Sequence, residues 1–106
     1  MSKKWNELKD EYFYPSYPMC WACERRTAVD GGHGVINKGQ LNNAKRHKDL
    51  DVKENFVPQC AECNRHGAVD SFEVRRRMYY KKCDELGKER VDRWLDSLDL
   101  KVKPRF

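Results

Sequence analysis

Residues 20–63 decide the fold: they begin with CWAC (20–23), contain DGGH (30–33) and end with CAEC (60–63). Two C-x-x-C pairs at this separation are the ligand pattern of a structural zinc site, since Zn²⁺ takes four thiolates tetrahedrally. A site closed by four protein ligands has no open position for a substrate, so we expect the metal to be structural. The predicted zinc ligands are Cys20, Cys23, Cys60 and Cys63.

The composition predicts a thin hydrophobic core. Of the 106 residues, 39% are hydrophobic and 37% are charged, and a metal cross-link is a common remedy for such a shortage. The chain has five cysteines and no secretion signal, which favours reduced thiolates on zinc over disulfides. The remaining cysteine, Cys83, is expected to be a buried hydrophobic residue. No apolar run reaches membrane-spanning length, so we expect a cytoplasmic protein without a membrane partner.

The charge balance favours a polyanionic partner. Lys and Arg number 22 against 17 Asp and Glu, which gives a net charge of +5. Two basic stretches could contact phosphates: the loop at 38–48, with Lys45 and Arg46, and the helix around Arg75 and Arg76. For each of these side chains, an ordinary solvated surface position remains an open alternative.

Hydrophobic spacing and capping residues predict one domain over residues 1–106, with a core at about 18–70 and C-terminal helices at about 71–99. Ser2, Asn64 and Ser71 are expected to cap helices, and Gly87 to end one. The expected elements are a helix at 2–14, strands near 27–29 and 35–36 around a glycine-rich turn, a loop at 37–51 with one helical turn at 41–44, a short helix from 64, helices at 71–87 and 88–98, and a mobile tail at 101–106.

Three residues inside the cysteine frame could perform chemistry. His33 is flanked by glycines, and its ordinary pKa near 6.5 suits a general base at neutral pH. Asp30 offers a hard oxygen ligand for a divalent cation, and Asn64 is fixed in space by the adjacent zinc cysteine. Together they could hold one Mg²⁺ or Mn²⁺ that keeps several waters and binds phosphate oxygens.

The order of these motifs resembles the zinc-stapled form of the His-Asn-His (HNH, ββα-metal) endonucleases. The matching residues are DGGH at 30–33, Asn55, and QCAECN at 59–64. More narrowly, the chain is similar to the phage NinG/Rap recombination nucleases over about residues 20–95. This resemblance implies a small α+β fold, with a ββα-metal core, a four-cysteine zinc site and flanking α-helices.

The resemblance also implies a role for each matching residue. His33 would activate the water that attacks the scissile phosphate, and Asn55 would brace the loop that carries it. Asp30 and Asn64 would bind the catalytic Mg²⁺ or Mn²⁺, although most family members carry the acidic ligand immediately before the histidine, where this chain has Gly32. Three further residues follow in the sequence: Arg65 and His66 could contact phosphate or complete the metal shell, and Asp70 could be a helix cap or a further ligand.

The sequence therefore predicts a metal-dependent DNA endonuclease that acts in phage recombination or DNA processing within a bacterial host cell. No base-reading motif is apparent, so we expect recognition of single-stranded or branched DNA by shape. Symmetric resolution of a junction would call for a homodimer. The alternative is a non-catalytic zinc module that only binds nucleic acid or protein, which would need neither His33 nor Asp30.

Overall fold

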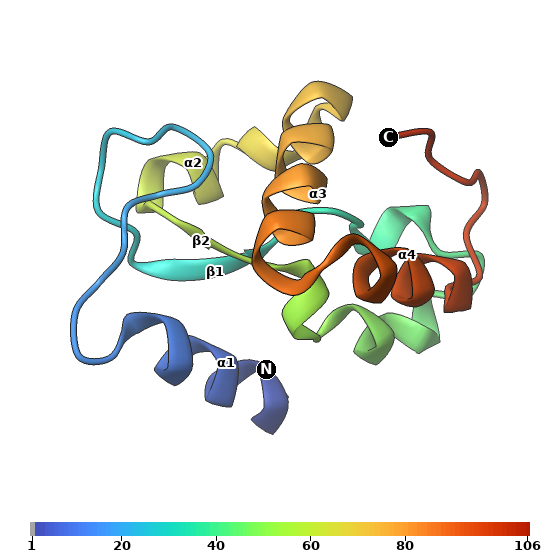
Figure 1. Ribbon diagram of the computed structural model, residues 1–106, viewed down its shortest axis with the longest axis horizontal. Helices are drawn as coiled ribbons and strands as arrows, with labels where there is room; N and C mark the ends of the chain where they lie inside the picture. The colour runs from blue at the N-terminus through green and yellow to red at the C-terminus, as the bar shows by residue number, and fades with distance from the viewer. Residues whose placement is uncertain (1) are drawn as a thin grey trace.

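A helix, α1 (Lys3–Phe13), opens the part of the chain that the computed structural model describes, residues 2–106 except the side chain of Ala68. The predicted cap is confirmed: the Ser2 Oγ accepts a hydrogen bond from the Trp5 N–H at 3.1 Å. Trp5 and Leu8 are buried and pack with Phe56, so α1 covers one side of the small sheet (Figure 1).

The sheet has two antiparallel strands, β1 (Asp30–His33) and β2 (Phe56–Gln59), in the register Asp30 opposite Gln59 and His33 opposite Phe56. The predicted hairpin was wrong, because the glycine-rich residues form a strand instead of its turn. Because these glycines lack side chains, the side chains of Phe56 and Gln59 on the partner strand can pack against them. A Cβ on Gly31 would lie 2.2 Å from the Phe56 ring, and a Cβ on Gly32 would lie 1.8 Å from Oε1 of Gln59.

Three 3₁₀ segments connect the two strands: η1 (Lys38–Gln40), η2 (Ala44–Leu50) and η3 (Lys53–Asn55). The predicted helical turn at 41–44 was wrong, since Leu41 is buried and forms a β-bridge with Leu100. Leu50 at the end of η2 is fully buried, so the connection is anchored to the core through these two leucines.

A short helix, α2 (Ala61–Arg65), follows β2 directly. Its N-cap is Cys60 and not Asn64 as predicted, because the Cys60 Sγ accepts the Cys63 N–H at 3.4 Å. Asn64 consequently lies inside the helix, one residue after the last cysteine of the cluster. A 3₁₀ turn, η4 (Ala68–Asp70), leads on to the C-terminal helices.

The two C-terminal helices are α3 (Phe72–Leu86) and α4 (Lys88–Ser97). Both predicted boundary residues are confirmed: the Ser71 Oγ accepts the Val74 N–H, and Gly87 ends α3 with a positive φ of 94°. On α3, Phe72 is half exposed, whereas Lys82 is buried. On α4, Val91, Trp94 and Leu95 are buried, whereas Leu98, just after its end, is partly buried against the core.

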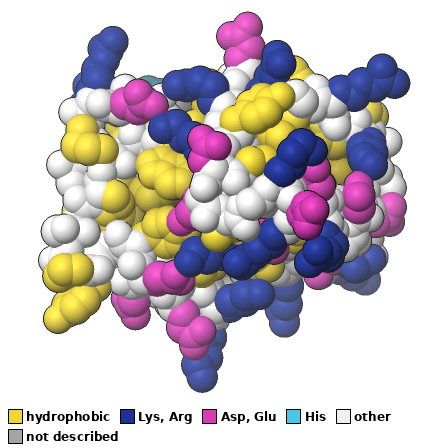
Figure 2. Space-filling view, viewed as in Figure 1, with side chains coloured by type: hydrophobic (Ala, Val, Ile, Leu, Met, Phe, Trp, Pro, Cys, Tyr) yellow, Lys and Arg dark blue, Asp and Glu magenta, His cyan; other side chains and the backbone are white. Residues whose placement is uncertain are grey.

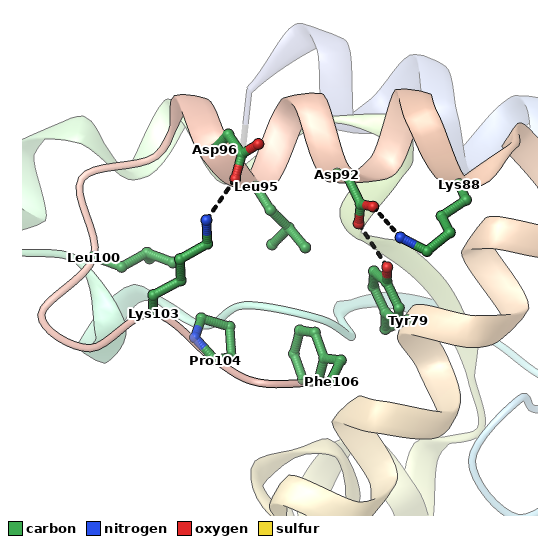
Figure 3. A pocket seen from close by; sticks show the side chains of 9 residues that line it. All are labelled: Tyr79, Lys88, Asp92, Leu95, Asp96, Leu100, Lys103, Pro104 and Phe106. Atoms are coloured by element: carbon green, nitrogen blue, oxygen red, sulfur yellow. Dashed lines mark hydrogen bonds and ion pairs between the residues drawn. The ribbon is translucent and has the colours of Figure 1, made fainter.

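The C-terminal tail is packed, not mobile as predicted. The Phe106 ring stacks on Tyr79 with centroids 4.9 Å apart, and Tyr80 donates a hydrogen bond to the Phe106 carbonyl at 2.9 Å. Lys103 pairs with Asp96 of α4 at 2.9 Å (Figure 3). Aromatic stacking and this ion pair close a pocket of about 290 Å³ between the tail and α4.

The molecule is thus a small α+β structure in which helices lie on both sides of a two-stranded sheet (Figure 1). The main core lies on the side of α3 and α4, opposite α1. In the described part of the chain, no helix is long and apolar enough to cross a membrane. Basic side chains are distributed over the face in Figure 2 with acidic side chains among them, so the excess positive charge is dispersed there.

Candidate functional site

Four cysteines from two distant segments form one cluster. The Sγ atoms of Cys20, Cys23, Cys60 and Cys63 all lie within 4.8 Å of one another, and across the two motifs the Sγ atoms of Cys23 and Cys60 are 3.9 Å apart. A tetrahedral ion with Zn–S bonds of about 2.3 Å separates its sulfurs by about 3.8 Å. The cluster therefore has the donor set and the spacing to hold a structural metal ion.

Backbone groups around the cluster favour ionised thiols at two of its positions. The N–H groups of Arg25 and Arg26 lower the pKa of Cys23 to about 6. The Cys63 N–H likewise lowers the pKa of Cys60, whereas burial raises the pKa of Cys63. Because thiolates packed this closely repel one another, full ionisation of the cluster needs a cation at its centre.

The loop of the first cysteine pair is fixed to both the sheet and α3. The Trp21 N–H donates to the Pro58 carbonyl at 2.9 Å, and the Arg77 guanidinium donates to the Ala22 carbonyl at 3.1 Å. Cys83 lies outside the cluster, partly buried against the core, and its burial raises the pKa of its thiol. This position agrees with the expected hydrophobic role of Cys83.

All three predicted chemical residues line a pocket of about 330 Å³, and Asn64 connects it to the cluster because it directly follows Cys63 in the chain. Asp30 and His33 come from the two ends of β1, and Asn64 comes from α2, immediately after Cys63. The remaining lining residues are Trp5, Gly31 and Asp51. One strand and one short helix thus bring an imidazole, a carboxylate and an amide to a common opening.

Asp51 is the residue of this pocket that sequence reasoning missed. Its Oδ1 lies 2.9 Å from Nε2 of His33, and the two side chains are 15% and 33% exposed. An ionised carboxylate only accepts hydrogen bonds, so Nε2 is the nitrogen that donates in this contact, and in a neutral ring the lone pair would then be on Nδ1. Asp51 follows a charged loop, and nothing in that loop distinguishes it from Asp49 before folding brings it to His33.

Asn55 is fully buried and holds the two segments that carry His33 and Asp51. Its Oδ1 accepts the Val35 and Ile36 N–H groups, both at 2.9 Å. Its Nδ2 donates to the Ile36 carbonyl at 2.9 Å and to the Leu50 carbonyl at 3.1 Å. All four hydrogen-bonding positions of the amide are therefore used. They bind a segment that begins two residues after His33 and the residue immediately before Asp51.

The Asp30 carboxylate is held by a backbone N–H and by a lysine ammonium. Its Oδ1 accepts the Gly31 N–H at 2.8 Å and pairs with Nζ of Lys9 at 3.1 Å. Among the described residues, the four cysteines are the only group of three or more Cys, His, Asp or Glu side chains close enough to share an ion. The oxygen-bearing side chains that line the pocket are those of Asp30, Asp51 and Asn64, and of these Asp51 contacts His33.

The other predicted residues do not line this pocket. His66 pairs with Glu62 at 3.5 Å, and Asp70 pairs with Arg75 at 3.7 Å. Arg75 is largely buried, its side chain being 14% exposed. The predicted phosphate contacts that are exposed to solvent are Lys45, Arg46, Arg65 and Arg76.

No protein-family model and no curated protein matches the sequence, and no solved structure matches the fold.

Proposed function

We propose that this protein is a metal-dependent endonuclease with a zinc-stapled ββα-metal core, which hydrolyses phosphodiester bonds in DNA. The observation that carries the proposal is the common pocket of Asp30, His33 and Asn64, the last of which directly follows Cys63 of the four-cysteine cluster. The order β1, β2, α2 and the resemblance to His-Asn-His nucleases agree with it. Zinc is the proposed occupant of the cluster, because four thiols at this spacing match its preferred donors.

His33 acts as the general base in this proposal. With its Nε2 proton held by Asp51, the ring accepts a proton from water at Nδ1, and Asp51 stabilises the resulting imidazolium. The water oxygen forms a bond to phosphorus while the bond between phosphorus and the leaving oxygen breaks. Asn55 keeps the segments of His33 and Asp51 in register throughout.

Asp30 and Asn64 are the residues that would hold Mg²⁺ or Mn²⁺ in the pocket. When bound, such an ion neutralises the charge that develops on the phosphate. The exposed side chains of Lys45, Arg46 and Arg65 supply further phosphate contacts at the surface.

The proposed substrate is branched or single-stranded DNA, cut during recombination or DNA processing in a phage-infected bacterium. Symmetric resolution of a junction would require two copies of the chain.

The test is a cleavage assay with His33→Ala on single-stranded, duplex and four-way-junction DNA in Mg²⁺ or Mn²⁺. Loss of the base is expected to reduce cleavage by about 10²-fold or more. Zinc content and circular dichroism should stay unchanged, because His33 contacts none of the four thiols. Equal cleavage by the variant and the wild type would reject the nuclease function and leave the non-catalytic zinc module.

A further inference from the structure

The N-terminal helix α1 forms one wall of the candidate pocket. Trp5 lines the pocket, and its ring centroid lies 4.8 Å from that of His33. Lys9 stands one helical turn further on, on the same face of α1 as Trp5, with its Nζ 3.1 Å from Oδ1 of Asp30. The helix therefore brings a positive charge to the carboxylate that the proposed function assigns to a divalent cation.

The ion pair of Lys9 and Asp30 is accessible to an exchange of partners. The two side chains are 32% and 33% exposed, so neither charge is sealed from water. A divalent cation that binds the Asp30 carboxylate would lie within a few ångströms of the Lys9 ammonium. Two positive charges at that distance repel each other. Because Lys ends a flexible stem of four carbons, its ammonium can leave the carboxylate without a change in the backbone.

The helix itself is fixed by other contacts. Trp5 is 3% exposed and Leu8 is 7% exposed, and both pack with Phe56 of β2. An exchange at Asp30 therefore involves the Lys9 side chain alone while the wall of the pocket stays in place.

We propose that Lys9 is an exchangeable counter-ion, which yields Asp30 to a divalent cation and then binds a phosphate of the nucleic-acid strand at the pocket. The inference rests on the proposed function, and it adds a phosphate-binding residue from α1 that the sequence analysis did not identify. If Lys9 only stabilised the fold through this ion pair, replacing Lys9 would leave the affinity of the protein for a divalent cation unchanged or lower it.

The first experiment measures Mn²⁺ binding to the zinc-loaded protein by calorimetry. Lys9→Met removes the competing ammonium at similar helix propensity, and is expected to tighten Mn²⁺ binding about two- to fivefold. Lys4→Met is the matched control on α1, since Lys4 is exposed and carries the same charge; it should bind Mn²⁺ like the wild type. Asp30→Asn should remove the binding, which assigns the signal to this pocket. Equal or weaker Mn²⁺ binding by Lys9→Met would overturn the proposal.

The second experiment measures affinity for a single-stranded oligonucleotide against salt concentration, with Mn²⁺ present. A His33→Ala background prevents cleavage of the strand. Adding Lys9→Met is expected to reduce the slope of log affinity against log salt by about one, whereas adding Lys4→Met should leave the slope unchanged. An unchanged slope with Lys9→Met would overturn the phosphate contact.

Different results would contradict the proposed cation site and the proposed role of Lys9. If the folded, zinc-loaded wild type does not bind Mn²⁺, the cation site of the proposed function is wrong and the role of Lys9 is overturned with it. If the wild type binds Mn²⁺ through Asp30 and Lys9→Met binds it with the same affinity, only the role of Lys9 is overturned.

Discussion

The Nε2 atom of His33 lies 2.9 Å from Oδ1 of Asp51, although 18 positions separate the two residues in the chain. The pair joins the end of β1 to the residue after η2, at the opening that Asp30 and Asn64 also line. A histidine whose one nitrogen is held by a carboxylate presents the other in a fixed tautomer. This arrangement makes Asp51 a positioning residue for the proposed base.

Asp51→Asn is expected to reduce cleavage of DNA by about 10- to 100-fold, because the amide carries no charge to stabilise the imidazolium. The KM should change much less than kcat, because Asp51 contacts His33 and none of the side chains proposed to bind phosphate. Steady-state cleavage assays measure both. Asp49→Asn, two residues earlier, is the control and should keep the kcat of the wild type, because Asp49 pairs with Arg46 and not with His33. Comparable loss of kcat in both variants would contradict the positioning role.

Asn55→Ala is expected to lower the free energy of unfolding by about 2–4 kcal/mol. The change leaves the buried N–H groups of Val35 and Ile36 without their acceptor. Urea denaturation followed by circular dichroism measures the loss. Asn42→Ala is the control, since the Asn42 amide donates to Asp99 and Leu100 at the surface; its cost should stay below about 1 kcal/mol. Similar stability of the two variants would show that the Asn55 hydrogen bonds do not hold the site.

Cys60→Ala is expected to abolish stoichiometric zinc binding and to unfold the protein, because it removes one of four ligands and the N-cap of α2. Zinc content by atomic emission and circular dichroism check the two effects. Cys83→Ala, outside the cluster, should keep one zinc per chain and lose only about 1 kcal/mol of stability. A folded Cys60→Ala variant with a full complement of zinc would refute the structural role of the cluster.

Lys82 is expected to make the stability of the protein depend on pH in the alkaline range. Its side chain is fully buried, its Nζ donates to the Tyr12 hydroxyl at 2.8 Å and to Glu85 at 2.7 Å, and it lies 4.9 Å from the ring centroids of both Tyr12 and Trp21. Burial lowers the pKa of Lys82 from 10.5 to about 8.

Between these two values the unfolded chain binds more protons than the folded one, so this residue makes the free energy of unfolding rise with pH. Urea denaturation of the wild type and of Lys82→Met at several pH values isolates the effect. From about pH 7.5 to about pH 10, the wild type should gain about 2 kcal/mol relative to Lys82→Met. Parallel pH profiles would show that Lys82 does not titrate with a lowered pKa in the folded state. The raised pKa values of Tyr12 and Tyr79 act in the opposite direction and mainly above pH 10, in both proteins.

The sequence by itself determined the features that depend on local chemistry. The spacing of the C-x-x-C pairs predicts the cysteine cluster, since a pair of thiols three residues apart can face one ion from a single turn. Ser2, Ser71 and Gly87 set helix boundaries for the same local reasons, a side-chain acceptor or a positive φ. The candidate residues Asp30, His33 and Asn64 could also be selected from the sequence, because Asp30 and His33 belong to the DGGH motif and Asn64 directly follows the last cysteine of the frame.

Only the tertiary structure decided which distant residues meet. The glycines at 31 and 32 suggested a turn, but the side chains of Phe56 and Gln59 fill the space next to them and make the segment a strand. Asp51 and Lys9 have no local signature, because their roles depend on partners 18 and 21 positions away. Long-range packing against β1 fixes both contacts, and residue spacing along the chain carries no information about them.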